Sequence, residues 1–309
     1  MSRRDGVDIA VVGGGVVGAA AALAFARDGW RVALLEAREP PAWRESAPDL
    51  RVFAIAPDGM ALFDALDAGA AIRAARAPAY RRMEVWDAAG GGTLDFDADR
   101  FARRELGWIV ENGLLVDRLW QGLRREGVEL HVPAAVDAFE QDDARATLRL
   151  DDGRRLQAKL VVAADGAAST LRRLADIGTA AHDYRQSGLV GYVETERPLH
   201  ATCYQRFLPT GPLAFLPVDA HRASIVWTLP TDEAARLREV DDQAFAVALT
   251  DASAARLGRV TPVSARAAFP LRRQLATTQR AGRLLLVGDA AHVVHPLAGQ
   301  GVNLGLRDV

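Results

Sequence analysis

The chain has 309 residues, enough to bury a sizeable core in one large domain or in two intimate ones. Half of its residues are hydrophobic, a quarter are charged and the formal net charge is −2, so nothing indicates electrostatic binding to nucleic acid. The single cysteine, Cys203, excludes an intramolecular disulfide and a metal site built from cysteines, and no apolar run approaches the ~20 residues of a membrane span.

The N-terminal stretch has the pattern of a nucleotide-binding βαβ unit. A strand, an alanine-rich helix and a second strand are predicted over residues 8–12, 19–27 and 31–35. Gly13, Gly15 and Gly18 fit G-x-G-x-x-G. Gly13 suits the tight turn, Gly15 the approach of backbone N–H groups to a pyrophosphate, and Gly18 the packing of helix on strand. Glu36 ends the second strand, where a carboxylate binds a ribose 2′-OH and repels a 2′-phosphate, which favours FAD or NAD over NADP.

The middle of the chain changes from alternating strands and helices to runs of strands. Helices are predicted over 57–68, 114–125, 231–238 and 241–249, and strands over 81–86, 93–96, 128–132, 136–139, 146–150, 154–156, 187–195, 201–208, 212–218, 222–229 and 266–273. Strands without intervening helices indicate an antiparallel sheet distinct from the opening βαβ unit. We therefore expect two interleaved domains. Residues 1–78, 98–178 and 274–309 form a nucleotide-binding domain, and residues 79–97 and 179–273 form a substrate-binding sheet domain.

Two positions in the first predicted domain admit both a functional and a structural interpretation. A guanidinium at Arg51 could reach a cofactor's phosphates or ribityl chain, although composition alone favours a surface arginine. Asp165-Gly166 ends a buried strand at 159–163, Ser169 is placed to cap the following helix, and Arg172 lies one turn into it. An ordinary strand–turn–helix explains this second stretch as well as a binding site does.

The C-terminal stretch is the second strong signal. Gly288 and Asp289 follow a buried strand at 283–287, and the carboxyl ends of strands are where α/β sheets bind ligands. Gly299 and Gly301 permit close approach of the backbone, and a helix that begins near Gln300 could direct N–H groups at an anionic ring such as a reduced flavin. A metal site on Asp289, His292 and His295 is the weaker interpretation, because Pro296 disfavours a common face and no fourth ligand is evident. We expect no metal.

Three separated motifs together resemble the class A flavoprotein aromatic hydroxylases. They are Gly13-x-Gly15-x-x-Gly18 with Glu36, Asp165-Gly166 with Arg172, and Gly288-Asp289 with Pro296-x-x-Gly299-Gln300-Gly301-x-Asn303. Within this class the chain is most similar to the ubiquinone-biosynthesis ring hydroxylases that act on octaprenylphenols, through residues 51–55, 108–112, 211–217 and 288–308.

The resemblance implies an α/β fold. A Rossmann-like FAD-binding domain of the glutathione-reductase type would be interleaved with an antiparallel-sheet substrate domain, as in p-hydroxybenzoate hydroxylase. Members of the family commonly continue with further helices beyond the position of Val309, so we expect a C-terminal cover to be missing, which puts activity of this polypeptide in doubt. Gly113 also departs from the longer polar residue that relatives often carry there.

The resemblance also implies residue roles. A tightly bound FAD would be held by Gly13, Gly15, Gly18, Glu36, Arg51, Asp165, Gly166, Gly288, Asp289, Gly299, Gln300, Gly301 and Asn303. Pro296, Gly299 and Gln300 would form the flavin and oxygen locus, with no acid–base residue nominated. Tyr204, Phe207, Phe215 and Trp227 would form the far wall of the substrate site, although each could equally be core.

The implied chemistry is hydroxylation of the aromatic ring of a polyprenylated phenol. NAD(P)H reduces FAD as a transient reductant, and O2 then forms a C4a-hydroperoxyflavin that transfers OH to the ring. The expected location is cytoplasmic, with peripheral contact at the inner membrane face or with a biosynthetic complex, and no nucleic-acid partner. Three alternatives stay open: hydroxylation of a small soluble aromatic acid bound by Arg206 or Arg222, flavin-dependent reduction of prenyl double bonds, and binding of a partner subunit without catalysis.

Overall fold

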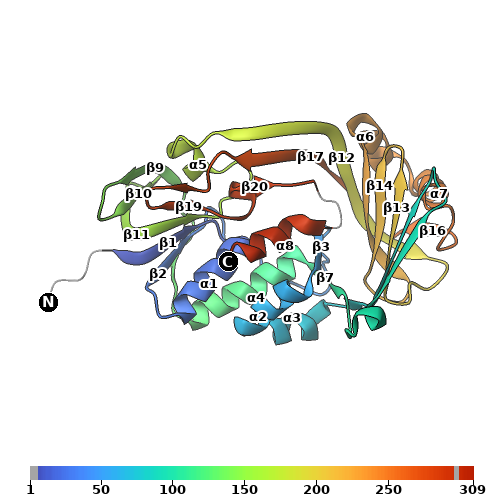
Figure 1. Cartoon of the computed structure of the whole chain (residues 1–309), viewed down its shortest axis with the longest axis horizontal. Coiled ribbons are helices and arrows are strands. Elements are labelled where there is room, and N and C mark those ends of the chain that lie inside the picture. The colour runs from blue at the N-terminus through green and yellow to red at the C-terminus, as the bar shows by residue number, and fades with distance from the viewer. Residues whose placement is uncertain (1–5, 296–298) are drawn as a thin grey trace.

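The computed structural model describes residues 6–295 and 299–309, which form two large β-sheets, one small sheet and the helices packed around them (Figure 1). In these residues the first sheet has eight strands, and its main path runs β18-β19-β11-β1-β2-β8. Their bounds are β1 Val7–Val12, β2 Val32–Leu35, β8 Glu129–His131, β11 Arg155–Ala163, β18 Arg280–Ala281 and β19 Leu284–Leu286, with β9 Val136–Gln141 and β10 Ala146–Leu150 added antiparallel beside β11.

The centre of this sheet is parallel, as the apolar runs predict. Val11 of β1 pairs with Leu34 of β2 on one side and with Val162 of β11 on the other, and all three are buried. Helices cover one face in Figure 1, with α1 (Val16–Arg27) lying against α4 (Asn112–Arg125). The pair is close because Gly122 of α4 faces Leu23 of α1, where an added Cβ would lie 2.7 Å from Leu23 Cδ2.

A three-stranded sheet and three further helices complete this part of the described molecule. The strands are β3 (Val52–Ile55), β7 (Gly107–Glu111) and β4 (Ala79–Tyr80), and the helices are α2 (Pro57–Ala65), α3 (Gly69–Arg76) and α8 (Gln300–Arg307). Short helices also occur at α5 (Thr170–Leu174), η1 (Ala98–Phe101) and η2 (Gly288–Ala290). Figure 1 shows α8 beside α1, with the last residues of the chain next to the first helix.

The second large sheet has nine strands in the described chain. Its main path runs β20-β17-β12-β15-β14-β13-β5-β6, and β16 pairs with β12 beside this path. The bounds are β5 Arg82–Asp87, β6 Thr93–Asp97, β12 Thr179–Thr195, β13 Thr202–Leu208, β14 Gly211–Pro217, β15 Arg222–Pro230, β16 Val260–Pro262, β17 Ala267–Ala276 and β20 His292–Val293. The helices α6 (Thr231–Glu239) and α7 (Asp242–Ala252) cover its outer face. In Figure 1 the long β12 and β17 cross from this sheet to the first one.

Several predicted elements were wrong in extent, and at three places the physical reason is clear. Residues 155–163 form one strand, β11, in place of the two predicted over 154–156 and 159–163, because the same segment pairs antiparallel with β10 and parallel with β1. The strand β12 begins at Thr179 rather than at residue 187, since its first half is polar and largely exposed and so lacks an apolar pattern. The helix predicted over 57–68 ends at Ala65, and α3 follows it after Asp67, whose φ of 55° breaks the helical path.

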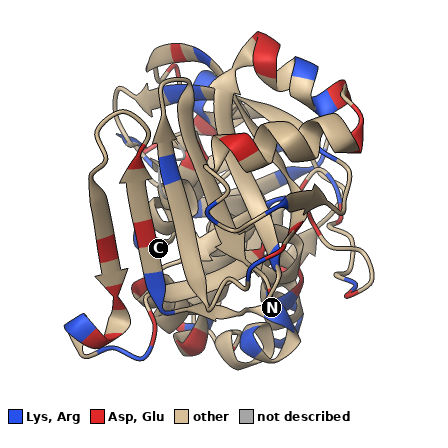
Figure 2. Ribbon diagram, turned by 90° about the vertical axis from the view of Figure 1, so that its right-hand side faces the viewer, with Lys and Arg blue, Asp and Glu red and all other residues tan. Residues whose placement is uncertain are grey.

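The surface carries charges of both signs. Figure 2 shows Lys and Arg interspersed with Asp and Glu across the face that bears α6 and α7. Among the described residues, no helix has the length and apolar character required to cross a membrane.

Candidate active site

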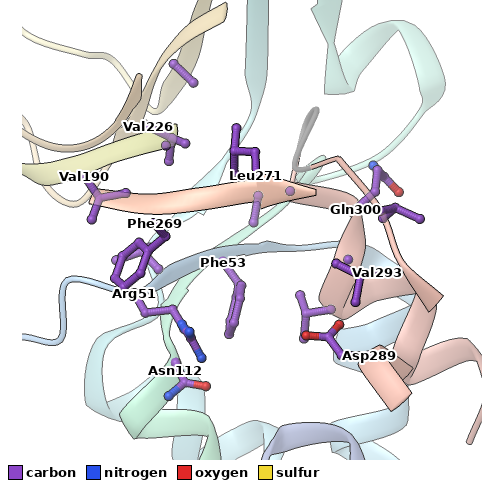
Figure 3. A pocket seen from close by; sticks show the side chains of 18 of the residues that line it. Arg51, Phe53, Asn112, Val190, Val226, Phe269, Leu271, Asp289, Val293 and Gln300 are labelled. Atoms are coloured by element: carbon purple, nitrogen blue, oxygen red, sulfur yellow. The ribbon is translucent and has the colours of Figure 1, made fainter. Parts of the chain in front are cut away.

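A cavity of about 820 Å³ lies between the two large sheets. One wall is made by the β1–α1 turn, the segment that enters β3, η2 and the N-terminus of α8. The opposite wall is the inner face of the nine-stranded sheet. Figure 3 shows Arg51, Phe53 and Asn112 below the strand that carries Phe269 and Leu271, with Asp289 and Gln300 at the other end. The cavity is of the size that suits a large organic ligand.

Gly13 and Gly18 have the steric properties that the sequence predicts. An added Cβ would lie 2.3 Å from the Ala164 carbonyl oxygen at Gly13 and 2.0 Å from the Gly13 oxygen at Gly18, so neither position accepts a side chain. The φ of Gly13 is also 105°, in the left-handed region. Gly15 differs, because it lines the cavity and no atom lies within 4 Å of an added Cβ. It caps α1, whose first N–H groups face this space.

Glu36 lies at the glycine turn rather than on the cavity wall. Its Oε2 accepts a hydrogen bond from the Gly14 N–H at 2.6 Å, and its Oε1 accepts from the Arg38 N–H at 3.1 Å. The buried Trp120 of α4 donates its indole N–H to the Gly14 carbonyl at 2.8 Å. Contacts from Glu36, directly after β2, and from Trp120 of α4 therefore fix both polar groups of the Gly14 backbone.

Arg51 and Asp289 line opposite parts of the cavity. Arg51 lies just before β3, and its guanidinium carbon is 5.9 Å from the centre of the Phe269 ring. Asp289 is in η2, at the carboxyl end of β19. The surrounding cavity walls raise the pKa of the Asp289 carboxyl by desolvation, and the positive charge of Arg51 acts in the opposite direction.

The motif around Asp165 has both structural and site features. Asp165 Oδ2 accepts hydrogen bonds from the N–H groups of Thr170 and Leu171 at 2.8 and 3.1 Å, while its Oδ1 is buried without a partner. Ser169 caps the same helix as predicted, since its Oγ accepts from the Arg172 N–H at 3.0 Å. Gly166 is in the cavity lining with a φ of 79°.

Arg172 joins two of the three motifs. Its guanidinium is buried and donates to the carbonyl of Ala290 at 2.8 Å and to that of Ala167 at 2.8 Å. Burial lowers its pKa, opposed by the charge of Asp165. The Asp165-Gly166 and Gly288-Asp289 segments are thus held at one end of the cavity by a single side chain.

The N-terminus of α8 closes the same end of the cavity. Gly299 caps the helix in a left-handed conformation with a φ of 64°, and Gly299, Gln300 and Gly301 all line the cavity. Asn303 is buried behind them and is not in the lining. Its Oδ1 accepts from the Ala56 N–H at 2.9 Å, and its Nδ2 donates to the carbonyls of Ala54 and Gly299 at 2.9 and 3.2 Å. Pro296 lies outside the described residues.

The proposed aromatic wall is the part of the sequence analysis with least support from the geometry. Side chains alternate along strands, and in this sheet the cavity faces Pro212, Ala214 and Leu216 of β14 and Val226 and Thr228 of β15. Phe215 and Trp227 therefore point to the other face, where they are buried beneath α6 and α7. Phe207 is 37% exposed and is not in the lining. Of the four, only Tyr204 is in the lining, but it lies opposite Phe215 in the sheet and packs against the same outer core, where its ring stacks edge-on against Trp86.

Several lining residues were not predicted as site residues. They include Phe53, Asn112, Val190, Gln205, Phe269, Leu271 and Arg272. Most are apolar strand residues without a motif, and only the pairing of strands shows that they share one face. Cys203 also lines the cavity, and burial raises the pKa of its thiol, in agreement with an inert core cysteine. Arg206 and Arg222, the candidate carboxylate partners, do not line it; Arg206 donates to the Ala252 carbonyl and Arg222 pairs with Asp219.

The described histidines near the C-terminus contact other side chains. His292 Nε2 lies 2.7 Å from Asp308 Oδ2, which also accepts the Gly288 N–H at 2.7 Å. His295 stacks edge-on against Tyr184, with 4.9 Å between the ring centres. Within residues 6–295 and 299–309, no group of three or more potential ligands could hold a metal ion.

The residues at the nucleotide end of the cavity fit an FAD dinucleotide. The cradle at Gly15 has room that a side chain would fill, and two helix N-termini face the space. Asp165 is not itself in the lining, but it lies between the lining residues Ala164 and Gly166, and its buried Oδ1 has no protein donor. The remaining cavity is largely apolar, as a flavin ring and an aromatic substrate require.

Comparison with known proteins gives the same assignment. Residues 6–309 match the FAD binding domain family. The chain is 42% identical to 3-demethoxyubiquinol 3-hydroxylase of Escherichia coli over 98% of this chain and 77% of the relative. It is 36% identical to ubiquinone hydroxylase UbiL of Rhodospirillum rubrum over 98% and 70% of the two chains. Among solved structures, PqsL of Pseudomonas aeruginosa, described as a probable FAD-dependent monooxygenase, matches with a TM-score of 0.81 and 27% identity over 98% and 83%.

A family match across nearly the whole chain and relatives of this similarity agree with the site geometry. The chain therefore belongs to the FAD binding domain family, and within it to the FAD-dependent aromatic hydroxylases related to those of ubiquinone biosynthesis.

Proposed function

We propose that this chain hydroxylates the aromatic ring of a polyprenylated phenol at the expense of NAD(P)H and O2. The overall change would be ArH + NAD(P)H + H⁺ + O2 → ArOH + NAD(P)⁺ + H2O. The observation that supports it best is one cavity with a nucleotide cradle at one end and an apolar sheet face along its other wall. The names of the relatives, which include ubiquinol and ubiquinone hydroxylases, support the class of substrate.

We propose that the motif residues hold FAD in two groups. Gly13, Gly15, Gly18 and Glu36 form the cradle for the adenosine half, because the α1 N-terminus attracts the pyrophosphate and the Glu36 carboxylate accepts ribose hydroxyls. Arg51, Asp165, Gly166, Gly288 and Asp289 lie along the middle of the cofactor. Asn303 acts indirectly, since its amide holds the α8 N-terminus against β3.

Bound FAD, once reduced by NAD(P)H, supplies the activation of O2 and the transfer of one oxygen atom. The residues of the chain orient the flavin and the substrate ring and shield them from water. The N–H groups of Gln300 and Gly301 at the α8 N-terminus stabilise negative charge, because the helix dipole is positive at that end. Val190, Val226 and Leu271 form an apolar ceiling that excludes water from the ring. Pro296 remains a proposed neighbour of the oxygen locus.

The domain division is also a proposal. The core beneath α6 and α7 supports a separate substrate domain over 79–97 and 179–273, and the strand pairs of the first sheet support a cofactor domain over 1–78, 98–178 and 274–309. Contact with a membrane surface is part of the same proposal, because the substrate is a lipid.

The first experiment is to add FAD to the purified chain and record its visible spectrum after gel filtration. The proposal predicts a retained flavin spectrum, followed by oxygen consumption and formation of a hydroxylated product when NAD(P)H and a prenylphenol are supplied. Retained flavin with NAD(P)H oxidation but without product from any phenol would contradict it.

A further inference from the structure

The inner face of the nine-stranded sheet extends beyond the cavity. Strand pairing places Cys203 and Gln205 of β13, which line the cavity, opposite Met83 and Val85 of β5. The next strand, β6, places Phe96 opposite Met83 and Leu94 opposite Val85. Directly opposed residues point to the same face of a sheet, so these side chains form one continuous surface.

The part of this surface outside the cavity is apolar and uncovered. Leu94 is 62% exposed, Phe96 40% and Phe207 37%, which are high values for large hydrophobic side chains. Phe207 is opposite Pro212, itself a cavity residue. The other face of the same strands carries the ion pairs Arg82–Asp95 and Arg256–Glu84, so the charges of this hairpin lie on the opposite side.

We propose that Leu94, Phe96 and Phe207 form a track that binds the isoprenoid tail of the substrate after the tail leaves the cavity. The inference rests on the proposed function, since it takes the ring to lie in the cavity. The isoprenoid tail is the expected ligand because the track is continuous with the cavity that holds the ring. The track begins at Met83 and Pro212 on the cavity wall, and it is made of apolar side chains on the outer strands of the sheet. A flexible hydrocarbon chain gains affinity along such a surface for each methylene group that it buries.

The test uses the holoenzyme with two phenols that share one ring, one with an isoprenoid tail and one without. The measured quantity is the ratio of the KM of the tail-free phenol to that of the tailed phenol. The double substitution Leu94→Gln with Phe96→Gln is expected to lower this ratio about tenfold with kcat for the tailed phenol retained, because the tail loses apolar contact. The control is Val247→Gln, a 57% exposed apolar residue of α7 on the far side of the sheet, which should leave the ratio unchanged.

The outcomes separate the inference from the function on which it rests. Hydroxylation of both phenols with the same ratio in the wild type and the double variant would overturn the tail track and leave the proposed function intact. A wild-type KM ratio near one would also overturn the tail track and leave the proposed function intact. Absence of product from both phenols would overturn the proposed function and the track with it. A change of molecular mass by light scattering in the double variant, with an unchanged ratio, would assign the surface to contact between copies of the chain and overturn the track.

Discussion

At the scale of single residues, the glycines of the first motif differ in the space around their Cα atoms. Gly13 and Gly18 leave no space for a Cβ because neighbouring backbone atoms lie within 2.3 Å of it, so these two glycines serve the fold. Gly15 leaves open space toward the cavity, so we propose that it serves the ligand. Glycine is therefore needed for two different physical reasons within one motif, and substitutions at Gly13 or Gly18 and at Gly15 can distinguish them.

The substitution Gly15→Val is expected to abolish retention of FAD while the apoprotein keeps its thermal midpoint. The added side chain meets no protein atom, but it occupies the space that the pyrophosphate needs. Flavin absorbance after gel filtration and the unfolding midpoint without FAD are the two measurements. Gly90→Val is the matched control, since Gly90 lies in the β5–β6 hairpin with equally open space. A variant that kept its flavin would contradict the assignment of Gly15.

Glu111 is a buried carboxylate that organises the segment before Arg51. Its Oε1 accepts from Arg76 Nε at 2.7 Å, and its Oε2 accepts from the Trp43 indole N–H at 3.2 Å and the Asp49 N–H at 2.8 Å. Asp49 in turn accepts the Arg51 N–H at 2.9 Å. The ion pair thus fixes the backbone that presents Arg51 to the cavity.

We expect Glu111→Gln to lower the free energy of unfolding by about 3 kcal/mol, because the Arg76 guanidinium loses its counter-charge in a largely buried site. Urea denaturation of the apoprotein measures this. The control is Glu233→Gln, which removes an exposed partner of Arg236 on α6 and should change stability little. Equal effects of the two substitutions would show that the Arg76–Glu111 pair is not specially stabilising.

At the scale of elements, α8 is held in place by side chains at both ends. Asn303 joins its first turn to Ala54 of β3 and to Ala56 before α2 through two hydrogen bonds of 2.9 Å, and a third of 3.2 Å goes to Gly299 at the start of the same helix. Asp308, just after its last turn, accepts from Gly288 and pairs with His292. These contacts position both α8 and η2, the two elements that close one end of the cavity.

The substitution Asn303→Ala should cost about 2 kcal/mol of stability and weaken FAD binding, because it leaves the partly buried Ala56 N–H and Ala54 carbonyl without their partners. Chemical denaturation and titration with FAD are the measurements. Gln121→Ala, which removes an exposed amide of α4, is the control. Loss of stability without any change in FAD affinity would separate Asn303 from the site.

The contact between His292 and Asp308 predicts a pH dependence. The pKa of His292 is raised above 6.5, first by its hydrogen bond with Asp308 and against the opposing effect of burial. Because the folded pKa lies above the unfolded one, this stabilisation is complete below pH 6.5 and is lost as the pH rises through the raised folded pKa. Denaturation from pH 5.5 to 9 should show a decline in wild-type stability that His292→Gln lacks. Parallel profiles would contradict the linkage.

At the scale of the whole molecule, the sequence predicts the cofactor end of the site better than the substrate end. The turn at Gly13–Gly18 and the capping of α5 by Ser169 are local patterns, so short-range spacing suffices to find them. The substrate wall depends on which face of β14 and β15 looks inward. Phe215 and Trp227 alternate with the inward-facing Ala214, Val226 and Thr228, but both faces of these strands are buried and apolar. The alternation of apolar and polar residues therefore cannot show which face of β14 and β15 is turned toward the cavity.

The two large sheets meet around one cavity, so cofactor binding should couple their stability. Both walls contribute lining residues, and two further contacts join the parts: Tyr192 OH donates to the Asp49 carbonyl at 2.8 Å, and Gln274 Nε2 donates to the Ala167 carbonyl at 2.8 Å. Free FAD at 100 times its dissociation constant stabilises a protein that binds it only when folded by about 2.7 kcal/mol. Because FAD in the proposed position would contact both walls, we expect this gain to apply to the whole chain as one cooperative unit.

The measurement is urea unfolding in saturating FAD, followed both by circular dichroism and by recovery of free flavin fluorescence. The two transitions should coincide, and both should move to higher urea together as FAD is added. AMP is the control ligand, since it can occupy only the cradle at the glycine turn. At the same ratio of free ligand to dissociation constant, AMP should raise the midpoint as much as FAD, because the gain depends only on that ratio when the chain unfolds as one unit. Release of flavin well before the loss of secondary structure would contradict the coupling and would indicate that the nine-stranded sheet separates from the cofactor while the first sheet stays folded.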